Sequence, residues 1–423
     1  MLLRCDDPAQ RDAFGERQRS GARRFTRSGE FAARRILAIA PQPFYQDRGT
    51  PIALRQVLQA ASELGYQVDL LTFPVGSDIH LPGLRTFRAG NPLAIRSVPI
   101  GLSMRKLLLD ASLVRALRQR LSQETYTCVH ALEEAAWPAL VLARRHRIPL
   151  LYDMQSSLPE QLRKHAAARV PPMPMLLREA ERWLLGRADL VVASAGLGDR
   201  VRHTAPGTKV REWHFPSTPG EVPTFESLSL RRQLGLAQDA QVILYSGTFE
   251  TYQGLDDLVA AIPAVLAAVP EARFVLVGAD RAAGTPLPDG AAELTRTGIL
   301  TVVERQPRSS IPVYLAMADV LVSPRAFGGN LPLKIFDYLA AGRPIVATDI
   351  STHRSVLTQD TAVLVQPTSA ALAKGIVSIL GGPTRGRELG EAARQYAFEH
   401  LGWSRFVRTV GEIYDDVHGH VPA

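Results

Sequence analysis

Cysteine is almost absent from this sequence, in which Cys5 and Cys128 are the only two among 423 residues. Two cysteines cannot build a disulfide framework or a cysteine-rich metal site, so disulfide-stapled secreted folds are excluded. Cys128 borders an expected strand, and we interpret it as a small buried apolar side chain. This cysteine usage indicates a cytoplasmic protein.

Long apolar runs are also missing. No uninterrupted apolar stretch reaches about 18 residues, so no transmembrane helix is expected. The N-terminus lacks the apolar core of a signal peptide, which argues against export. Hydrophobic residues make up 46% and charged residues 21% of the chain, as in soluble globular proteins, and the length suits about two domains.

Lysine is scarce as well, since only five of the 49 basic residues are Lys, although the net charge is +8. Two interpretations of this Arg-rich positive charge are given equal weight. One is a compositional preference for Arg, and the other is an anionic partner, either a phosphate-bearing substrate or a lipid surface. Nucleic acid is not expected as a partner, because the basic residues are scattered and no aromatic side chains alternate with them.

The order of expected elements divides the chain. Residues 1–34 are polar, Arg-rich and without period, so we expect a disordered basic tail. Residues 35–215 alternate between strands and helices, which predicts a first domain. Its expected strands are 36–40, 68–72, 127–132, 150–153 and 190–193, and its expected helices are 50–64, 105–121 and 135–145.

A second series occupies residues 224–395, after a Pro/Gly-rich linker at 216–223. Its expected strands are 242–246, 273–277, 300–303, 320–323 and 345–347, and its expected helix is 254–269. The chain is expected to end in helices at about 387–400 and 404–417. The fold class is therefore α/β, with two doubly wound Rossmann-like domains facing across a cleft. Residues 396–423 are expected to be helical and to pack back toward the first domain.

The most informative stretch, residues 318–349, reads as strand, glycine loop, helix and strand. Asn330 is the expected N-cap of the helix, with Pro332 in its first turn. Backbone N–H groups at a helix N-terminus, flanked by Arg325 and Lys334, form an anion site. Asp337 can accept hydrogen bonds from a ribose hydroxyl. Together these features predict a pocket for a sugar nucleotide, with no metal site and no other cofactor.

The same residues carry a family resemblance. The segment Ser323–Tyr338 matches the pattern SPR-x-x-G-x-N-x-P-x-K-I-[YF]-[DE]-Y, and the chain from Ile36 onward resembles the retaining glycosyltransferases of family 4. The resemblance implies the GT-B fold and metal-independent transfer, of the hexosyltransferase type, from a nucleoside diphosphate sugar to an unknown acceptor. The family's Glu-x7-Glu signature would place its two carboxylates at residues 329 and 337, which here are Gly329 and Asp337.

A second family motif also departs from its usual form. The diphosphate-binding Arg and Lys of the family fall on Thr248 and Gln253, so Arg325 and Lys334 are the expected replacements. The resemblance assigns the remaining donor contacts to Gly247, Thr248, Arg305, Gly329, Asn330, Leu331 and Asp337. Of these, Asp337 would hold the ribose, and Arg305 would lie near the base.

In the first domain, Gly49 and Thr50 look like the family's acceptor-side loop, although they could equally be a plain helix start before Pro51. Gln155 stands where the family carries a His at the reaction centre. His130 is a second candidate for the cleft wall, and a structural histidine is an equal alternative. Together with Arg325 and Lys334, these two side chains form the predicted catalytic set.

Two segments raise the hypothesis of peripheral contact with the inner face of an anionic membrane. Residues 101–109 mix Leu with basic side chains, and residues 171–178 are apolar and expected to be a loop. An ordinary core-facing helix is the alternative. Two other functions stay open. A non-catalytic sugar-nucleotide binding protein is one, and a sugar-nucleotide 2-epimerase, disfavoured by the carboxylate missing at Gly329, is the other.

Overall fold

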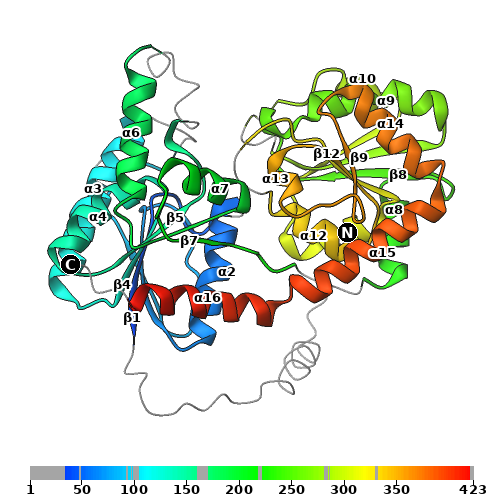
Figure 1. Ribbon diagram of the computed structural model, residues 1–423. Coiled ribbons are helices and arrows are strands. Elements are labelled where there is room, and N and C mark those ends of the chain that lie inside the picture. The colour runs from blue at the N-terminus through cyan, green and yellow to red at the C-terminus, as the bar shows by residue number, and fades with distance from the viewer. Residues whose placement is uncertain are drawn as a thin grey trace, which may run out of the picture. The chain divides into compact units, whose positions relative to one another are not determined.

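The computed structural model describes residues 34–46, 49–91, 94–96, 98, 104–159, 170–217, 222–280, 284, 286–328 and 332–419. Residues 35–423 form one compact unit. The predicted tail, residues 1–34, lies outside the described residues apart from Arg34. Within the compact unit the chain builds two parallel sheets, each covered by helices (Figure 1).

The first sheet has seven parallel strands in the order β3-β2-β1-β4-β5-β6-β7. The strands are β1 (Arg35–Ala40), β2 (Gln67–Thr72), β3 (Leu84–Arg88), β4 (Cys128–Leu132), β5 (Leu150–Met154), β6 (Leu190–Ala193) and β7 (Val210–Glu212). Ile36 of β1 pairs with Val68 of β2 on one side and with Cys128 of β4 on the other. The five strands predicted for this domain are confirmed, and β3 and β7 are additional edge strands.

Successive residues of β1 face opposite sides of this sheet. Ile36 and Ala38 pack in a cluster with α2, whereas Leu37 and Ile39 pack in a cluster with α3, α4 and α6. The helices are α2 (Gly49–Glu63), α3 (Met104–Gln123), α4 (Ala136–Arg145), α6 (Met173–Leu185) and α7 (Ala195–Thr204), and a short 3-10 helix η2 (Glu133–Ala135) precedes α4.

The prediction that residues 171–178 form a loop is wrong, because α6 begins at Met173. Pro174 lies in the first turn of this helix, where its missing N–H has no intrahelical partner to lose. The cluster of prolines therefore starts a helix here instead of preventing one.

The second sheet has six parallel strands in the order β10-β9-β8-β11-β12-β13. They are β8 (Gln241–Ser246), β9 (Ala272–Ala279), β10 (Leu300–Glu304), β11 (Val320–Ser323), β12 (Ile345–Thr348) and β13 (Val363–Val365). The helices are α8 (Thr224–Gln233), α9 (Leu255–Ala268), α10 (Ala291–Arg296), α11 (Ile311–Met317), α12 (Lys334–Ala341), α13 (Ser351–Arg354) and α14 (Ser369–Leu380), with 3-10 turns η4 (Thr251–Gln253) and η5 (Arg308–Ser310). Two Rossmann-like domains, as predicted, are thus confirmed.

The last two helices, α15 (Pro383–His400) and α16 (Trp403–His418), connect the second sheet's helices to the first sheet (Figure 1). α15 packs against α12, and α16 packs against α2. The Trp403 indole N–H donates to Glu63 at 2.8 Å, and Arg211 Nε donates to Asp416 at 2.7 Å. α16 is therefore an integral part of the packing around the first sheet.

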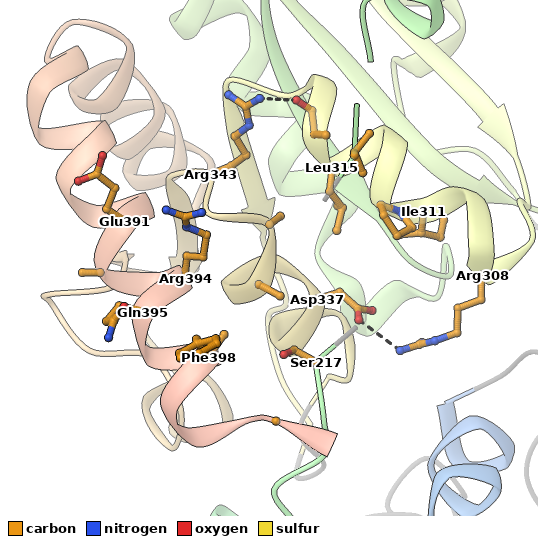
Figure 2. A pocket seen from close by; sticks show the side chains of 18 of the residues that line it. Ser217, Arg308, Ile311, Leu315, Asp337, Arg343, Glu391, Arg394, Gln395 and Phe398 are labelled. Carbon is orange, nitrogen blue, oxygen red and sulfur yellow. Dashed lines mark hydrogen bonds and ion pairs between the residues drawn. The ribbon is translucent and has the colours of Figure 1, made fainter. Parts of the chain in front are cut away.

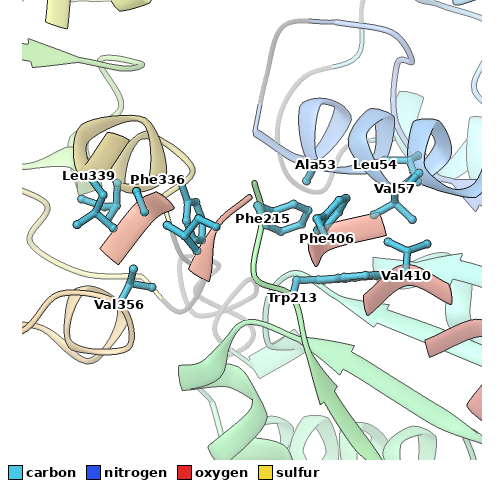
Figure 3. Close-up of a cluster of buried hydrophobic side chains, with 14 of the residues drawn as sticks. Ala53, Leu54, Val57, Trp213, Phe215, Phe336, Leu339, Val356, Phe406 and Val410 are labelled. Carbon is cyan, nitrogen blue, oxygen red and sulfur yellow. The ribbon is translucent and has the colours of Figure 1, made fainter. Parts of the chain in front are cut away.

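A continuous apolar cluster, with aromatic rings at its centre, runs from α2 to α12 (Figure 3). The ring of Phe215 lies 5.7 Å from that of Phe406 and 6.3 Å from that of Phe336, and Trp213 lies 6.1 Å from Phe406. All four side chains are buried. Because Phe215 contacts residues on both α16 and α12, one apolar core serves both sets of helices.

Candidate functional site

A cavity of about 840 Å³ is lined by the segments that follow the strands of both sheets. From the first sheet these are the segments after β1, β4, β5 and β6, and from the second sheet those after β8, β9, β10 and β11. Ligands of open parallel sheets bind at the carboxyl ends of the strands, so this cavity has the position of a ligand site.

Arg325 and Lys334 bring two cations into this cavity wall. The Arg325 side chain is buried, its Nε donates to the Phe327 carbonyl at 3.0 Å, and its guanidinium lies 5.1 Å from the ring centre of Tyr252. Lys334 Nζ donates to Gln253 Oε1 at 2.9 Å. The same ammonium lies 3.8 Å from the centre of the Tyr245 ring.

The electrostatic environment of these cations is unfavourable. Burial lowers the pKa of the Lys334 ammonium well below its usual value, and the positive charge of Arg325 lowers it further. Burial also lowers the pKa of Arg325. Desolvation disfavours the charged form of each group, and a like charge nearby adds to that effect. A bound anion would raise the pKa of both Lys334 and Arg325 again, because it favours their charged forms.

The wall beside these cations is bare backbone, provided by Gly247 and Gly278. A Cβ atom on Gly278, whose φ is +120°, would lie 2.1 Å from the Gly247 carbonyl oxygen. A Cβ atom on Gly247 would lie 3.0 Å from Lys334 Nζ. Glycine is thus required here by close approach as well as by backbone conformation. The predicted site residues Gly247 and Thr248 both line the cavity.

Asp337 and Arg308 form an ion pair at the cavity wall, with Arg308 Nη2 donating to Asp337 Oδ1 at 3.2 Å. Both residues also line a second cavity of about 1170 Å³ between α11, α12 and α15 (Figure 2). The pair therefore separates two hollows. Sequence reasoning found Asp337 but missed Arg308, which lies 29 positions away along the chain.

The first-domain side of the cavity contains Gln155, Gly49 and Thr50, three of the predicted residues. Gln155 Nε2 donates to Asp153 Oδ1 at 2.6 Å, and the Trp213 indole N–H donates to the same oxygen at 3.1 Å. Asp153 therefore fixes the orientation of the Gln155 amide. Gly49 is the first residue of α2, with Thr50 next to it.

His130 does not line this cavity, so its predicted place on the cleft wall is wrong. It lies in β4 with no exposed surface, and its Nδ1 is 3.0 Å from the Tyr414 hydroxyl of α16. Its Nε2 is 3.4 Å from Asp153. The surroundings of His130 support the alternative of a structural histidine, since both ring nitrogens have partners inside the core.

On the first-domain side of the cavity, three charged residues were not predicted as site residues: Lys106, Glu133 and Glu134. Lys106 pairs with Glu134, and Glu133 accepts a hydrogen bond from Ser156 Oγ at 3.0 Å. Glu133 also has a φ of +48°, which is uncommon for a residue with a side chain. The available sequence signal was the position of Glu133 and Glu134 directly after a parallel strand.

The glycine loop is only partly described. Gly329, Asn330 and Leu331 lie outside the described residues, so their predicted contacts stay predictions. The helix begins at Lys334 and its cap position is Leu333, without a side-chain hydrogen bond. The predicted N-cap at Asn330 is therefore wrong by three residues. Arg305 lines the cavity, with Nη1 4.0 Å from Asp280.

A buried histidine, His353 of α13, lies close to the two cations. Its Nδ1 is 2.7 Å from the Thr348 carbonyl oxygen, and its Nε2 is 3.0 Å from Ser323 Oγ. Burial lowers the pKa of His353 from 6.5 to about 4, and the charges of Lys334 and Arg325 lower it as well. The imidazole is therefore neutral in the folded protein at pH 7.

This histidine predicts a pH dependence of stability. Between pH 6.5 and 4 the unfolded chain binds a proton at residue 353 and the folded chain does not, so the free energy of unfolding falls as pH decreases. The slope is at most about 1.4 kcal/mol per pH unit, and full stability returns above pH 6.5. Urea unfolding at several pH values gives the free energy of unfolding as a function of pH. This free energy should depend less on pH in His353→Gln than in wild type. An equal pH dependence in the two proteins would show that His353 does not cause it. His400→Gln is the matched control at an exposed position.

In the part of the chain that the structure describes, no three His, Cys, Asp or Glu side chains gather as a metal site. No described helix is long and apolar enough to cross a bilayer.

Two family models match this chain, and both sides of the cavity fall within the matched regions. The model described as "Glycosyl transferase 4-like domain" matches residues 48–202. The model described as "Glycosyl transferases group 1" matches residues 240–382.

Similar curated proteins are glycosyltransferases. D-inositol 3-phosphate glycosyltransferase of Streptomyces scabiei (strain 87.22) is 27% identical over 301 residues, which cover 66% of this chain and 65% of the relative. This chain thus spans slightly less than two thirds of that relative. Phosphatidyl-myo-inositol mannosyltransferase of Mycobacterium leprae (strain TN) is 25% identical over 390 residues, which cover 90% of this chain and 97% of the relative.

Solved structures share the fold. Sucrose-phosphate synthase from Thermosynechococcus elongatus gives a TM-score of 0.76 at 22% identity, covering 91% of this chain and 99% of that one. HepE from Anabaena, in complex with UDP-glucose, gives a TM-score of 0.67 at 16% identity, covering 90% and 99%. At these identities the likeness concerns the arrangement of the two Rossmann-like domains.

Proposed function

We propose that this chain is a glycosyltransferase of the GT-B fold that transfers a sugar from a nucleoside diphosphate sugar to a hydroxyl acceptor, with retention of configuration. The observation that carries this proposal is the pair of cations in the wall of the cavity, of which Arg325 is buried and Lys334 is half-buried. Buried charges of like sign are unfavourable unless an anion joins them. The donor diphosphate supplies that anion.

The position of Lys334 supports its role as a replacement. The family resemblance places a diphosphate-binding Lys at residue 253, which here is Gln253. Lys334 Nζ contacts the side-chain oxygen of Gln253 at 2.9 Å, although the two residues are 81 positions apart. The ammonium group thus reaches the cavity wall from α12 instead of from the loop after β8.

The other donor contacts follow from the cavity lining. We propose that Gly247 and Thr248 approach the diphosphate and sugar, together with the backbone of residues 329–331. Asp337 would hold the ribose hydroxyls, with Arg308 holding the carboxylate in place. Arg305, at the end of β10, would lie near the base.

In the reaction, the bond between the sugar's anomeric carbon and the diphosphate oxygen breaks, and a bond to the acceptor oxygen forms. The acceptor hydroxyl gives up its proton to an oxygen of the leaving nucleoside diphosphate. Arg325 and Lys334 stabilise the charge that develops on the leaving diphosphate. Gln155, oriented by Asp153, lies on the acceptor side, where it positions a sugar hydroxyl rather than transferring a proton.

The experiment is a thermal-shift panel of UDP-, GDP-, ADP- and dTDP-sugars and the free diphosphates. A ligand that binds only the folded state raises the thermal midpoint, so stabilisation by one nucleotide series identifies the base. Donor turnover is then followed by chromatography. Slow hydrolysis of the sugar without acceptor is expected, whereas no stabilisation by any member of the panel would contradict the donor site.

A non-catalytic sugar-nucleotide binding protein is the second candidate, favoured by Gln155 in place of the family's His. It predicts stabilisation by a nucleotide sugar without hydrolysis or transfer. Conversion of the donor into its 2-epimer would instead select an epimerase. The same chromatography separates these three outcomes.

A further inference from the structure

Exposed apolar side chains are concentrated on one part of the molecule. Fourteen large apolar side chains are exposed in the described residues, and nine of them belong to residues 104–183. The nine are Met104, Leu107, Leu108, Val141, Val170, Met173, Met175, Leu176 and Trp183. Single exposed apolar residues are ordinary, but a cluster of this kind indicates an interaction surface.

The helices that carry these residues are neighbours. α3, α4 and α6 bury Leu113, Leu140 and Leu184 in the same cluster on one side of the first sheet (Figure 1). α4 and α6 also contact each other through Trp137 and Trp183, whose rings stack 5.8 Å apart. The fold therefore uses the inner sides of these helices. Eight of the nine exposed residues remain on their outer sides, and Val170 lies just before α6. We call this outer surface the α3–α4–α6 face.

This face adjoins the cavity. α3, α4 and α6 each begin at the carboxyl edge of the parallel sheet, the edge that carries the cavity. Lys106 of α3 lines the cavity, and its neighbour Leu107 is 50% exposed. In the first turn of α6, Met175 and Leu176 are 62% and 54% exposed.

The charges of this face have one sign. The exposed charged residues of α3, α4 and α6 are almost all arginines: Arg105, Arg115, Arg118, Arg144, Arg145, Arg178 and Arg182. The single exposed acid of the three helices is Glu179, which pairs with Arg182 at 2.9 Å. Helices that present apolar side chains together with Arg are suited to anionic lipid headgroups.

We propose that the α3–α4–α6 face docks the protein on an anionic membrane surface, with Met175 and Leu176 inserted at the headgroup level. Arginines on the same helices contact the lipid phosphates. The cavity then opens beside the bilayer, where an acceptor carried by a lipid can reach it. Docking itself does not depend on catalysis, although the lipid-borne acceptor rests on the proposed function.

Flotation of the full chain with vesicles tests this proposal. One vesicle set is phosphatidylcholine, and the other contains about 30 mol% phosphatidylglycerol. We expect binding to the anionic vesicles that weakens with added salt, because exposed charges are screened. The double variant Met175→Ser/Leu176→Ser should bind at least about tenfold more weakly, since it removes two inserted apolar side chains.

The matched control is Phe225→Ser/Leu228→Ser on α8, where the side chains are 69% and 49% exposed. This control should bind vesicles like wild type. Equal binding by both double variants, or no preference for anionic vesicles, would overturn the proposal. So would self-association of the wild type that the α6 variant abolishes, because the face would then belong to a second copy.

Two further readouts separate folding and function from docking. The α6 variant should keep the wild-type thermal midpoint and its stabilisation by the donor nucleotide, since Met175 and Leu176 lie outside the cavity lining. A lower thermal midpoint would mean that the double serine substitution acts through folding. The variant Met175→Ala/Leu176→Ala would then be used in its place. Vesicle binding without any response to nucleotides would refute the proposed function and leave docking intact.

Discussion

Replacing Lys334 by alanine is expected to weaken nucleoside diphosphate binding by more than about tenfold, or about 1.4 kcal/mol. The thermal midpoint of the ligand-free protein should remain nearly unchanged. Lys334 is half-buried beside a second cation, which lowers its pKa, so its charge contributes nothing favourable to the empty protein. The alanine variant loses two interactions of the folded protein, the hydrogen bond from Lys334 to Gln253 and the contact with the Tyr245 ring. Titration calorimetry and thermal unfolding measure the two quantities separately.

The chain offers two controls for this result. Lys374→Ala removes an exposed lysine of α14 and should change neither quantity. The pair Lys334→Gln with Gln253→Lys moves the ammonium group back to the loop after β8 and should recover part of the affinity. Unchanged affinity in Lys334→Ala would remove this residue from the donor site, and a large fall in the midpoint would show that its role is structural.

Replacing Phe406 by alanine is expected to lower the free energy of unfolding by about 3–5 kcal/mol. Phe406 is 2% exposed, and its ring lies 5.7 Å from those of Phe215 and Trp403. Removing it leaves a cavity where α16 meets the aromatic cluster of Figure 3. Tryptophan fluorescence during urea unfolding reports directly on this cluster, because Trp213 and Trp403 both contact Phe406.

Phe398→Ala is the matched control, since this α15 residue is 83% exposed. It should change the unfolding free energy by less than about 0.5 kcal/mol. Similar small effects of both substitutions would show that the cluster around Phe406 contributes little to stability and that the contact between α16 and the first sheet is loose.

The sequence predicted the buried strands well and the edge strands poorly. β6 and β11 were located to the residue, because a short run of apolar residues bounded by polar ones is distinctive: four apolar residues in β6, and three followed by Ser323 in β11. β3 was missed because a half-exposed edge strand, Leu84–Arg88, carries two arginines and shows no apolar run. β7 and β13 have three residues each, too few for any periodicity.

Prediction of the site residues was likewise limited to those that lie close together along the chain. Arg325, Lys334 and Asp337 were predicted because they lie within one short loop and helix, where spacing fixes relative position. The surroundings of His130 were not predictable, because its partner Tyr414 lies 284 positions away along the chain. The Lys106–Glu134 pair likewise joins two segments that sequence spacing does not relate.

The place of α16 also sets an order of events during synthesis. The elements of the second sheet lie within residues 224–380, and α15, which packs against α12, ends at His400, so all of these elements are made before α16. The first sheet cannot complete its core at that point, because Tyr414 and Phe406 are still to be made. Domains generally fold from the N-terminus during synthesis, and here the first domain is finished last. The apolar side of α2 that α16 covers therefore stays exposed in the nascent chain until α16 has been made.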